Sequence, residues 1–217
     1  MPRPRIKICC LSSPDEVAIA LAGGADLFGF VAPPLGGLGV IGEELIAQLI
    51  PTLPPGTTPV LLTGNQGLEE IAAQVVSCRP AAVQLVKSTT PAVRAALRER
   101  FPTLRLLQVV HVHGEEAIAD AVAAQEHSDA VLLDSSNPDK GQLGATGQTH
   151  DWSISAKVVE ACELPVFLAG GLSAANVAEA IATVRPAGVD LCSSVRTDGR
   201  LDPRKVAAFV AAVRATG

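Results

Sequence analysis

Short apolar runs alternate with longer Ala-rich segments along the whole chain. Several of the apolar runs are hydrophobic on both faces, which is typical of parallel strands covered by helices. The longer segments repeat their apolar positions with a helical period. We expect strands over 5–10, 26–31, 58–63, 81–86, 104–112, 128–134, 165–169 and 188–194. We expect helices from 14 to the glycines at 23–24, and over 42–50, 67–77, 90–100, 114–126, 152–161, 173–184 and 202–215.

The first of these helices carries clear end signals. Ser13 is suited to the N-cap and Pro14 to the first helical position, while Gly23-Gly24 is suited to the end of the helix. Strict alternation of strand and helix implies a parallel sheet. An open doubly wound sheet would also fit eight such units. Regular spacing, the lack of GxGxxG after the first strand, and polar residues gathered where strands end all favour closure. The predicted fold is α/β, a single (β/α)8 TIM barrel over 1–217.

Composition agrees with one such domain. The chain has 217 residues, of which 48% are hydrophobic, 18% charged and 3% aromatic, so the core must be built from Ala, Val, Leu and Ile. The net charge of -5 and the lack of a basic run argue against a nucleic-acid partner. No apolar run approaches the ~20 residues of a membrane span, and no signal peptide follows residues 1–5. We therefore expect a cytoplasmic protein with no membrane partner.

The five cysteines give no disulfide or metal pattern. Their number is odd, and the spacing of Cys and His does not match a metal site. Cys9 and Cys10 are adjacent in a predicted strand, where neighbouring side chains point to opposite faces. His111 and His113 share one strand face but lack a third ligand at a clear spacing. We expect reduced thiols and no metal site.

Two side chains stand where barrel strands meet the mouth. Cys9 ends the first strand, where a thiolate is able to act as a base, although a Cys in an apolar strand is more often a small buried hydrophobe. Asp134 ends the sixth strand. A carboxylate there is costly unless it is paired or functional, and the alternative is an Asp that caps a helix or fixes a loop.

The last two strands end in anion-binding features. Gly170-Gly171 precede Ser173, which is placed to cap the next helix, and exposed N–H groups at a helix start bind anions. Ser193 and Ser194 end the eighth strand. In these barrels the loops after strands seven and eight form the usual phosphate site. Ordinary capping by glycine is the alternative. Asp190, inside strand eight, needs a partner if it points into the barrel.

Seven segments in order resemble phosphoribosylanthranilate isomerases over nearly the whole chain. They are KIC (7–9), AGGADLFGFV (22–31), QL (84–85), LLDS (132–135), GATGQTHDW (144–152), LAGGLSAANV (168–177) and GVDLCSSV (188–195). The resemblance implies a TIM-barrel isomerase of tryptophan biosynthesis. Enzymes of this family convert an N-phosphoribosyl aldosamine to a 1-amino-1-deoxyketose by an Amadori rearrangement, without a cofactor.

The resemblance also implies residue roles. Cys9 would be the general base that takes the proton from sugar C2. Asp134 would be the general acid that protonates the ring oxygen. The substrate would be a phosphorylated sugar, bound by a monomer or a homodimer. Its phosphate would be bound by residues of three loops, namely Gly144, Thr146, Gly147, Gly170, Gly171, Ser193 and Ser194.

The chain departs from the family in the region that binds the anthranilate carboxylate. The family has S-P-R after strand two, whereas this chain has Leu35-Gly36-Gly37-Leu38 and no cation there. Lys87, after strand four, is our candidate replacement, and Asp190 is a further candidate substrate contact. Three readings stay open. The chain is a phosphoribosylanthranilate isomerase with a rebuilt carboxylate site, a related sugar-phosphate isomerase with a different aglycone, or a non-catalytic barrel that binds a phosphorylated metabolite.

Overall fold

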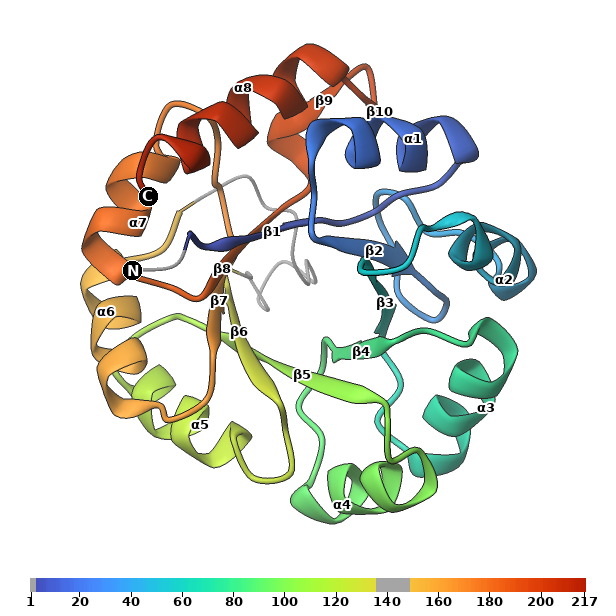
Figure 1. Ribbon diagram of the computed structural model, residues 1–217. Helices are drawn as coiled ribbons and strands as arrows, with labels where there is room; N and C mark the ends of the chain where they lie inside the picture. The colour runs from blue at the N-terminus through green and yellow to red at the C-terminus, as the bar shows by residue number, and fades with distance from the viewer. Residues whose placement is uncertain (1–2, 136–148) are drawn as a thin grey trace.

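The computed structural model describes residues 3–135 and 149–217. Eight parallel strands close into a barrel in sequence order, with the helices around it (Figure 1). The strands are β1 (Arg5–Ile8), β2 (Leu27–Val31), β3 (Thr58–Thr63), β4 (Ala82–Leu85), β5 (Arg105–His111), β6 (Ala130–Asp134), β7 (Val166–Leu168) and β8 (Gly188–Leu191). The helices are α1 (Pro14–Gly23), α2 (Glu43–Leu49), α3 (Leu68–Cys78), α4 (Pro91–Arg100), α5 (Glu116–Ala124), α6 (Trp152–Ala161), α7 (Val177–Val184) and α8 (Pro203–Arg214). The predicted fold class is confirmed.

The pairing of β1 with β8 closes the barrel and sets the register of the site. Lys7 lies opposite Asp190, and Ile8 lies opposite Leu191. Because side chains alternate along a strand, this register sends Lys7 and Asp190 to the same face of the sheet. Residues from the two ends of the chain therefore meet inside the barrel.

Alternation along the strands separates two layers of core. Ile6, Ile8 and Val189 pack outward against the helices, in a cluster that also contains helix residues such as Val206. Residues of the other parity fill the barrel interior, among them Leu62, Leu107, Val109, Leu132 and Phe167. Burial of apolar side chains on both faces explains why the strands read as continuous hydrophobic runs.

The ends of α1 follow the sequence signals. The Ser13 hydroxyl accepts a hydrogen bond from the N–H of Glu16 at 3.3 Å. Gly24 ends the helix in the left-handed region with φ of 86°, a conformation that glycine adopts without a Cβ penalty. Both predictions for this helix are confirmed.

Several element boundaries differ from the prediction, and three of them lie beyond the carboxyl ends of β1, β7 and β8. β1 ends at Ile8 and β8 at Leu191, and a 3-10 turn (Ser193–Val195) follows β8. α7 begins at Val177 rather than at 173, so Ser173 does not cap it. A short antiparallel hairpin of β9 (Arg196–Thr197) and β10 (Arg200–Leu201) lies before α8 and was not predicted. These differences lie where the backbone leaves the sheet to form the barrel mouth.

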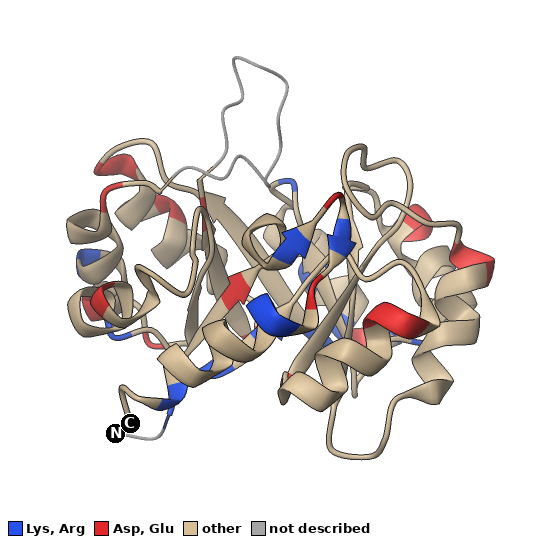
Figure 2. Ribbon diagram, turned by 90° about the horizontal axis from the view of Figure 1, so that it is seen from above, with Lys and Arg blue, Asp and Glu red and all other residues tan. Residues whose placement is uncertain are grey.

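Charged residues are spread over the surface. Figure 2 shows Lys and Arg mixed with Asp and Glu over the helices in that view, rather than gathered on one side. Within the described ranges, none of the helices has the length and apolar character that crossing a membrane requires.

Candidate active site

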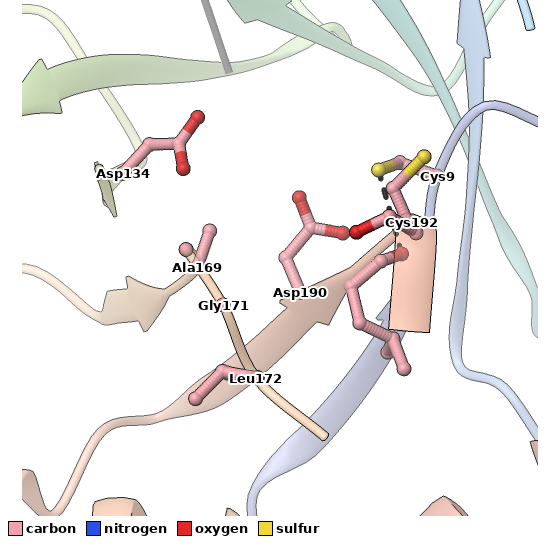
Figure 3. Close-up of a pocket in the computed structure, with 10 residues that line it drawn as sticks. Cys9, Asp134, Ala169, Gly171, Leu172, Asp190 and Cys192 are labelled. Carbon is pink, nitrogen blue, oxygen red and sulfur yellow. Dashed lines mark hydrogen bonds between the residues drawn. The ribbon is translucent and has the colours of Figure 1, made fainter. Parts of the chain in front are cut away.

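One pocket at the carboxyl ends of β1, β6, β7 and β8 brings most of the predicted site residues together. Figure 3 shows Asp134 on one side, the Cys9 and Cys192 thiols on the other, and Asp190 between them in this view. The pocket is lined by Cys9, Asp134, Ala169, Gly170, Gly171, Leu172, Asp190, Leu191, Cys192 and Ser193. The pocket lies where barrels of this kind carry their chemistry.

Strand parity explains why these side chains face inward. Cys9 lies two residues after Lys7, and Asp134 lies two residues after Leu132, which fills the barrel interior. Cys192 likewise lies two residues after Asp190. Each of these side chains continues the inward-facing row of its own strand beyond the last packed layer.

A glycine on the neighbouring strand makes room for Cys9. A Cβ placed on Gly29 would stand 2.8 Å from Cys9 Cβ and 3.1 Å from Leu62 Cδ1. Contacts this short require the Cys9 backbone or side chain to shift, since closely packed interiors have little space to spare. The position of the Cys9 thiol therefore depends on a glycine, which has no side chain, at residue 29.

The pKa of the Asp134 carboxyl lies near neutral pH. Burial raises the pKa of its carboxyl from 3.8 to about 7, and the negative charges of Asp190 and of a Cys9 thiolate act in the same direction. The N–H of Ser135 and the charge of Lys7 lower the pKa, but by less. A carboxyl with a pKa near 7 is protonated in a useful fraction of molecules at neutral pH.

Below the pocket lies a buried ion pair that the sequence did not reveal. Lys7 Nζ donates to Asp190 Oδ2 at 2.7 Å, and the two side chains are 0% and 5% exposed. Burial lowers the pKa of Lys7, but the adjacent Asp190 more than offsets this and holds the pKa above its usual value. Burial raises the pKa of Asp190 to about 8. Asp190 thus points into the barrel and has the partner that such a position requires.

Cys9 and Cys10 point to the same side, and our expectation of opposite faces is wrong. β1 ends before them, and Cys10 has φ of 64°, which breaks the alternation of the strand. The Cys10 thiol donates to Cys9 Sγ at 3.7 Å. Cys192, after β8, joins them. None of the five cysteines, all of which are described, forms a disulfide.

The three thiols ionise as a group. The contact with Cys10 lowers the pKa of Cys9, but Cys192 and burial outweigh it and raise the pKa of Cys9 to about 12. Hydrogen bonds from Cys10 and Cys9 lower the pKa of Cys192 to about 4, helped by the charge of Arg196. The Cys10 and Cys9 thiols therefore act as donors that favour the thiolate of Cys192.

The predicted phosphate-binding residues divide into two groups. Gly170 and Gly171 line the pocket with φ of 84° and 62°. Gly170 packs so closely on Ser135 that a Cβ would stand 2.3 Å from Ser135 Oγ. Exposed Ser193 also lines the pocket. Ser194 does not, and its buried hydroxyl has no hydrogen-bond partner among the described residues. Gly144, Thr146 and Gly147 lie outside the described residues.

The segment between β7 and α7 differs from our prediction that Ser173 caps the following helix. The Ser173 N–H donates to Asn176 Oδ1 at 2.8 Å, and Asn176 Nδ2 donates to the Gly171 carbonyl at 3.0 Å. The Asn176 side chain therefore fixes the glycine turn, while the N–H of Ser173 is already occupied. Among the described residues that line the pocket, Gly170, Gly171 and Ser193 are the predicted donors for an anion.

Lys87 lies apart from the pocket. It follows β4, is half-buried, and is not among the residues that line the pocket. Its carbonyl accepts a hydrogen bond from Gln108 Nε2 at 3.1 Å. Its proposed part in binding a carboxylate stays a prediction.

Arg196 is a second residue that sequence analysis missed. It forms a buried ion pair with Glu16 of α1, with Nη1 2.5 Å from Oε1. Its Nη2 donates to the Cys10 carbonyl at 2.6 Å. A charged residue two positions after Ser194 was the available signal, but its partner on α1 could not be identified from spacing.

Comparison with known proteins agrees with this architecture. The family model described as N-(5'phosphoribosyl)anthranilate (PRA) isomerase matches residues 6–212. The chain belongs to this family. Its members are isomerases, and the chain is therefore an enzyme of that class. An N-(5'-phosphoribosyl)anthranilate isomerase from Methanocella arvoryzae is 34% identical over 213 residues, covering 98% of this chain and 99% of that protein.

Solved structures of phosphoribosylanthranilate isomerases superpose closely. The enzyme from Thermotoga maritima matches with a TM-score of 0.84 and 28% identity, over 98% of this chain and 99% of that one. A further phosphoribosylanthranilate isomerase, solved in complex with reduced 1-(o-carboxyphenylamino)-1-deoxyribulose 5-phosphate, matches with a TM-score of 0.82 and 26% identity over 98% and 99% of the chains. The family's barrel is thus reproduced over nearly the whole chain.

Proposed function

We propose that this pocket catalyses the Amadori rearrangement of N-(5'-phosphoribosyl)anthranilate, with Asp134 as general acid and Cys9 as general base. The observation that carries the proposal is that both side chains line one pocket, in a chain that belongs to this family. The rearrangement moves hydrogen within the substrate, from C2 to C1 of the sugar, and leaves the overall oxidation level of the substrate unchanged. It therefore needs an acid and a base, and no redox partner.

Asp134 begins the reaction in this scheme. Its protonated carboxyl donates to the sugar ring oxygen, and the ring opens as the nitrogen lone pair forms a double bond to C1. The pKa of about 7 means that the carboxyl is partly protonated at neutral pH and its conjugate base is still strong enough to take a proton back. Asp134 is thus able to take part in both the opening step and the later proton transfers.

Cys9 then removes the proton from C2 of the open-chain sugar. This step needs the thiolate. The contact with Cys10 and the charge of Lys7 favour it, but Cys192 and burial outweigh them and raise the pKa of Cys9 to about 12. The Cys9 and Cys192 sulfurs lie within 4.8 Å of each other. A proton shift from Cys9 to Cys192 would bring the negative charge to the base without solvent entering the pocket. Loss of the C2 proton forms an enolamine, which becomes the aminoketose when C1 is protonated and the C2 hydroxyl gives up its proton.

The phosphate of the substrate is assigned to the loops after β7 and β8. Gly170, Gly171 and Ser193 lie at the pocket, and their positions suit backbone and hydroxyl donors to an anion. We assign Gly144, Thr146, Gly147 and Ser194 to the same role from the family resemblance. Asp190 is buried in its pair with Lys7, which favours a role in placing charge beneath the substrate over a direct contact.

The sequence of this chain departs from the family in the segment that would bind the aglycone. The Leu35-Gly36-Gly37-Leu38 segment has no cation for a carboxylate, and an Arg–carboxylate pair is strong and directional. Lys87 is our candidate for that contact. A Lys87→Ala variant should raise KM for phosphoribosylanthranilate and leave kcat nearly unchanged. Unchanged kinetics would remove Lys87 from the scheme.

The direct test is conversion of phosphoribosylanthranilate by the purified protein, followed as loss of substrate fluorescence. We expect turnover by the wild type. A matched phosphoribosylamine with no carboxylate on its aryl group should react more slowly. If only the second compound reacts, the chain is a sugar-phosphate isomerase with another aglycone. If neither reacts but ribose phosphates bind, the barrel is a binding protein.

A further inference from the structure

Three buried thiols from two distant segments meet at the barrel mouth. Cys9, Cys10 and Cys192 are 8%, 6% and 9% exposed. Their sulfur atoms all lie within 4.8 Å of one another, and Cys9 and Cys10 are 3.7 Å apart. A zinc ion with Zn–S bonds of about 2.3 Å in tetrahedral geometry places its sulfur ligands roughly 3.8 Å apart. The thiols are therefore nearly in position to share one ion.

The structure holds Cys10 in this place against its backbone preference. Its φ of 64° is in the left-handed region, which costs a non-glycine residue roughly 1–2 kcal/mol. Its carbonyl is held by Arg196 Nη2 at 2.6 Å, and Arg196 is itself fixed by Glu16. On the other side, Gly39 packs so tightly that an added Cβ would stand 2.3 Å from the Cys10 oxygen. The thiol at residue 10 is thus a fixed part of the cluster.

The charges around the cluster suit a cation. Asp190 is 4% exposed and lines the same pocket, and its Oδ1 has no hydrogen-bond partner among the described residues. The two basic side chains nearby are already engaged, Lys7 with Asp190 and Arg196 with Glu16. Three sulfur ligands with a buried carboxylate beside them select soft ions over magnesium or calcium.

We propose that Cys9, Cys10 and Cys192 form a binding site for a soft, thiophilic divalent cation of the zinc and cadmium type, and that its occupation inhibits the enzyme. Each sulfur binds the ion as a thiolate, any proton that it still carries is released to solvent, and no electron is transferred. The fourth position of the ion stays open toward the pocket. Inhibition follows because the Cys9 sulfur, once bound to metal, is unable to accept the C2 proton.

Sequence spacing could not reveal this site. Two of its ligands are adjacent residues in what reads as a strand, and the third lies near the other end of the chain. The closure of β8 onto β1 brings them together, and the left-handed turn at Cys10 gives the two neighbours a common direction.

The test is a titration of the full-length, reduced protein with cadmium under anaerobic conditions. We expect one ion per chain and the ultraviolet absorption of thiolate–cadmium charge transfer. Zinc should compete for the site, and magnesium should not. Cys10→Gly, in which glycine adopts the left-handed turn freely, and Cys192→Ser should each weaken binding by more than the roughly 10–100-fold that outer-shell changes cost. Cys162→Ser, which removes a thiol outside the cluster, should bind as the wild type does.

Two results would overturn the site. One is cadmium binding that is unchanged in Cys10→Gly and Cys192→Ser, and the other is no stoichiometric binding by the wild type. The inhibition rests on the proposed role of Cys9 and is measured separately, as loss of turnover that follows occupancy and is reversed by a chelator. A protein that binds the ion without showing isomerase activity would keep the site and remove the proposed function. An active enzyme that full occupancy leaves uninhibited would remove the inhibition.

Discussion

Lys7 and Asp190 form an ion pair of 2.7 Å inside the barrel, directly below the pocket. Lys7→Met would leave the Asp190 carboxyl buried without its partner. We expect a loss of roughly 3–5 kcal/mol in the free energy of unfolding, measured by urea denaturation. The loss should be smaller in acid, where the Asp190 carboxyl is neutral, and should grow as pH rises, because burial raises the pKa of Asp190 and the variant lacks the Lys7 charge that lowers it.

Arg100→Met is the matched control for that experiment. Arg100 pairs with Glu69 on the surface, where the two side chains are 46% and 76% exposed. Removing such a pair changes stability by about 0–1 kcal/mol. An equal effect of the two substitutions would show that the buried pair adds nothing beyond a surface contact.

The raised pKa of Asp134 predicts the alkaline side of the pH profile. Since a general acid must be protonated, kcat/KM should fall as pH rises through about 7.

The raised pKa of Asp134 also affects the stability of the fold. The pKa of this carboxyl is about 7 in the folded protein, above its ordinary value of 3.8. Its contribution to folding stability is therefore fully present below pH 3.8 and is lost as pH rises through about 7.

Asp134→Asn separates the two effects. The variant should match the stability of the wild type near pH 4 and exceed it at pH 8, where each kcal/mol raises Tm by about 2–4 °C in a chain of this size. A wild-type activity profile that is flat between pH 6 and 9 would mean that no acid with this pKa limits the reaction.

Gly29 is predicted to matter through the space it leaves. In Gly29→Ala the new Cβ would meet Cys9 Cβ at 2.8 Å and displace it. A misplacement of about 1 Å at a catalytic group is able to cost about 10²-fold in rate. We expect kcat to fall on this scale while circular dichroism shows a folded barrel. Gly42→Ala is the control, because nothing lies within 4 Å of a Cβ at that position. Equal kcat for the two variants would contradict the packing argument.

Ser193 offers a test of the phosphate assignment. Its side chain is exposed at the pocket, so Ser193→Asp would place a second negative charge beside the phosphate. Two like charges about 4 Å apart cost roughly 1–4 kcal/mol in surroundings between water and a protein surface. KM should therefore rise by at least about fivefold, and Ser193→Ala should have a smaller effect. Inorganic phosphate should lose affinity as an inhibitor in parallel. An unchanged KM in Ser193→Asp would move the phosphate elsewhere.

Sequence patterns were sufficient for the barrel because the signals are local. Runs of apolar residues and capping residues such as Ser13 and Gly24 fix strands and helices within a few residues. Cys9 and Asp134 were also found, since both end strands of a parallel barrel. Their positions became meaningful as a pair only through the family resemblance, because strand-end Cys and Asp residues often have purely structural roles.

What the sequence did not reveal depends on contacts between distant segments. The partner of Asp190 is Lys7, and it is fixed by the register between β1 and β8. The common direction of Cys9 and Cys10 depends on one left-handed residue, which Arg196 holds from the far end of the chain. Periodicity assumes regular strands, and it fails where the backbone leaves the sheet. That is the place where the pocket is built.

The most direct measurement of the acid–base account is the single-turnover rate of Cys9→Ser and Asp134→Asn with saturating phosphoribosylanthranilate. Each substitution removes one proton-transfer group and keeps the shape of the side chain, so each should lower the rate by about 10²–10⁴-fold with little change in KM. Cys162→Ser should react as the wild type does. A rate within a few-fold of the wild type for either Cys9→Ser or Asp134→Asn would contradict the account.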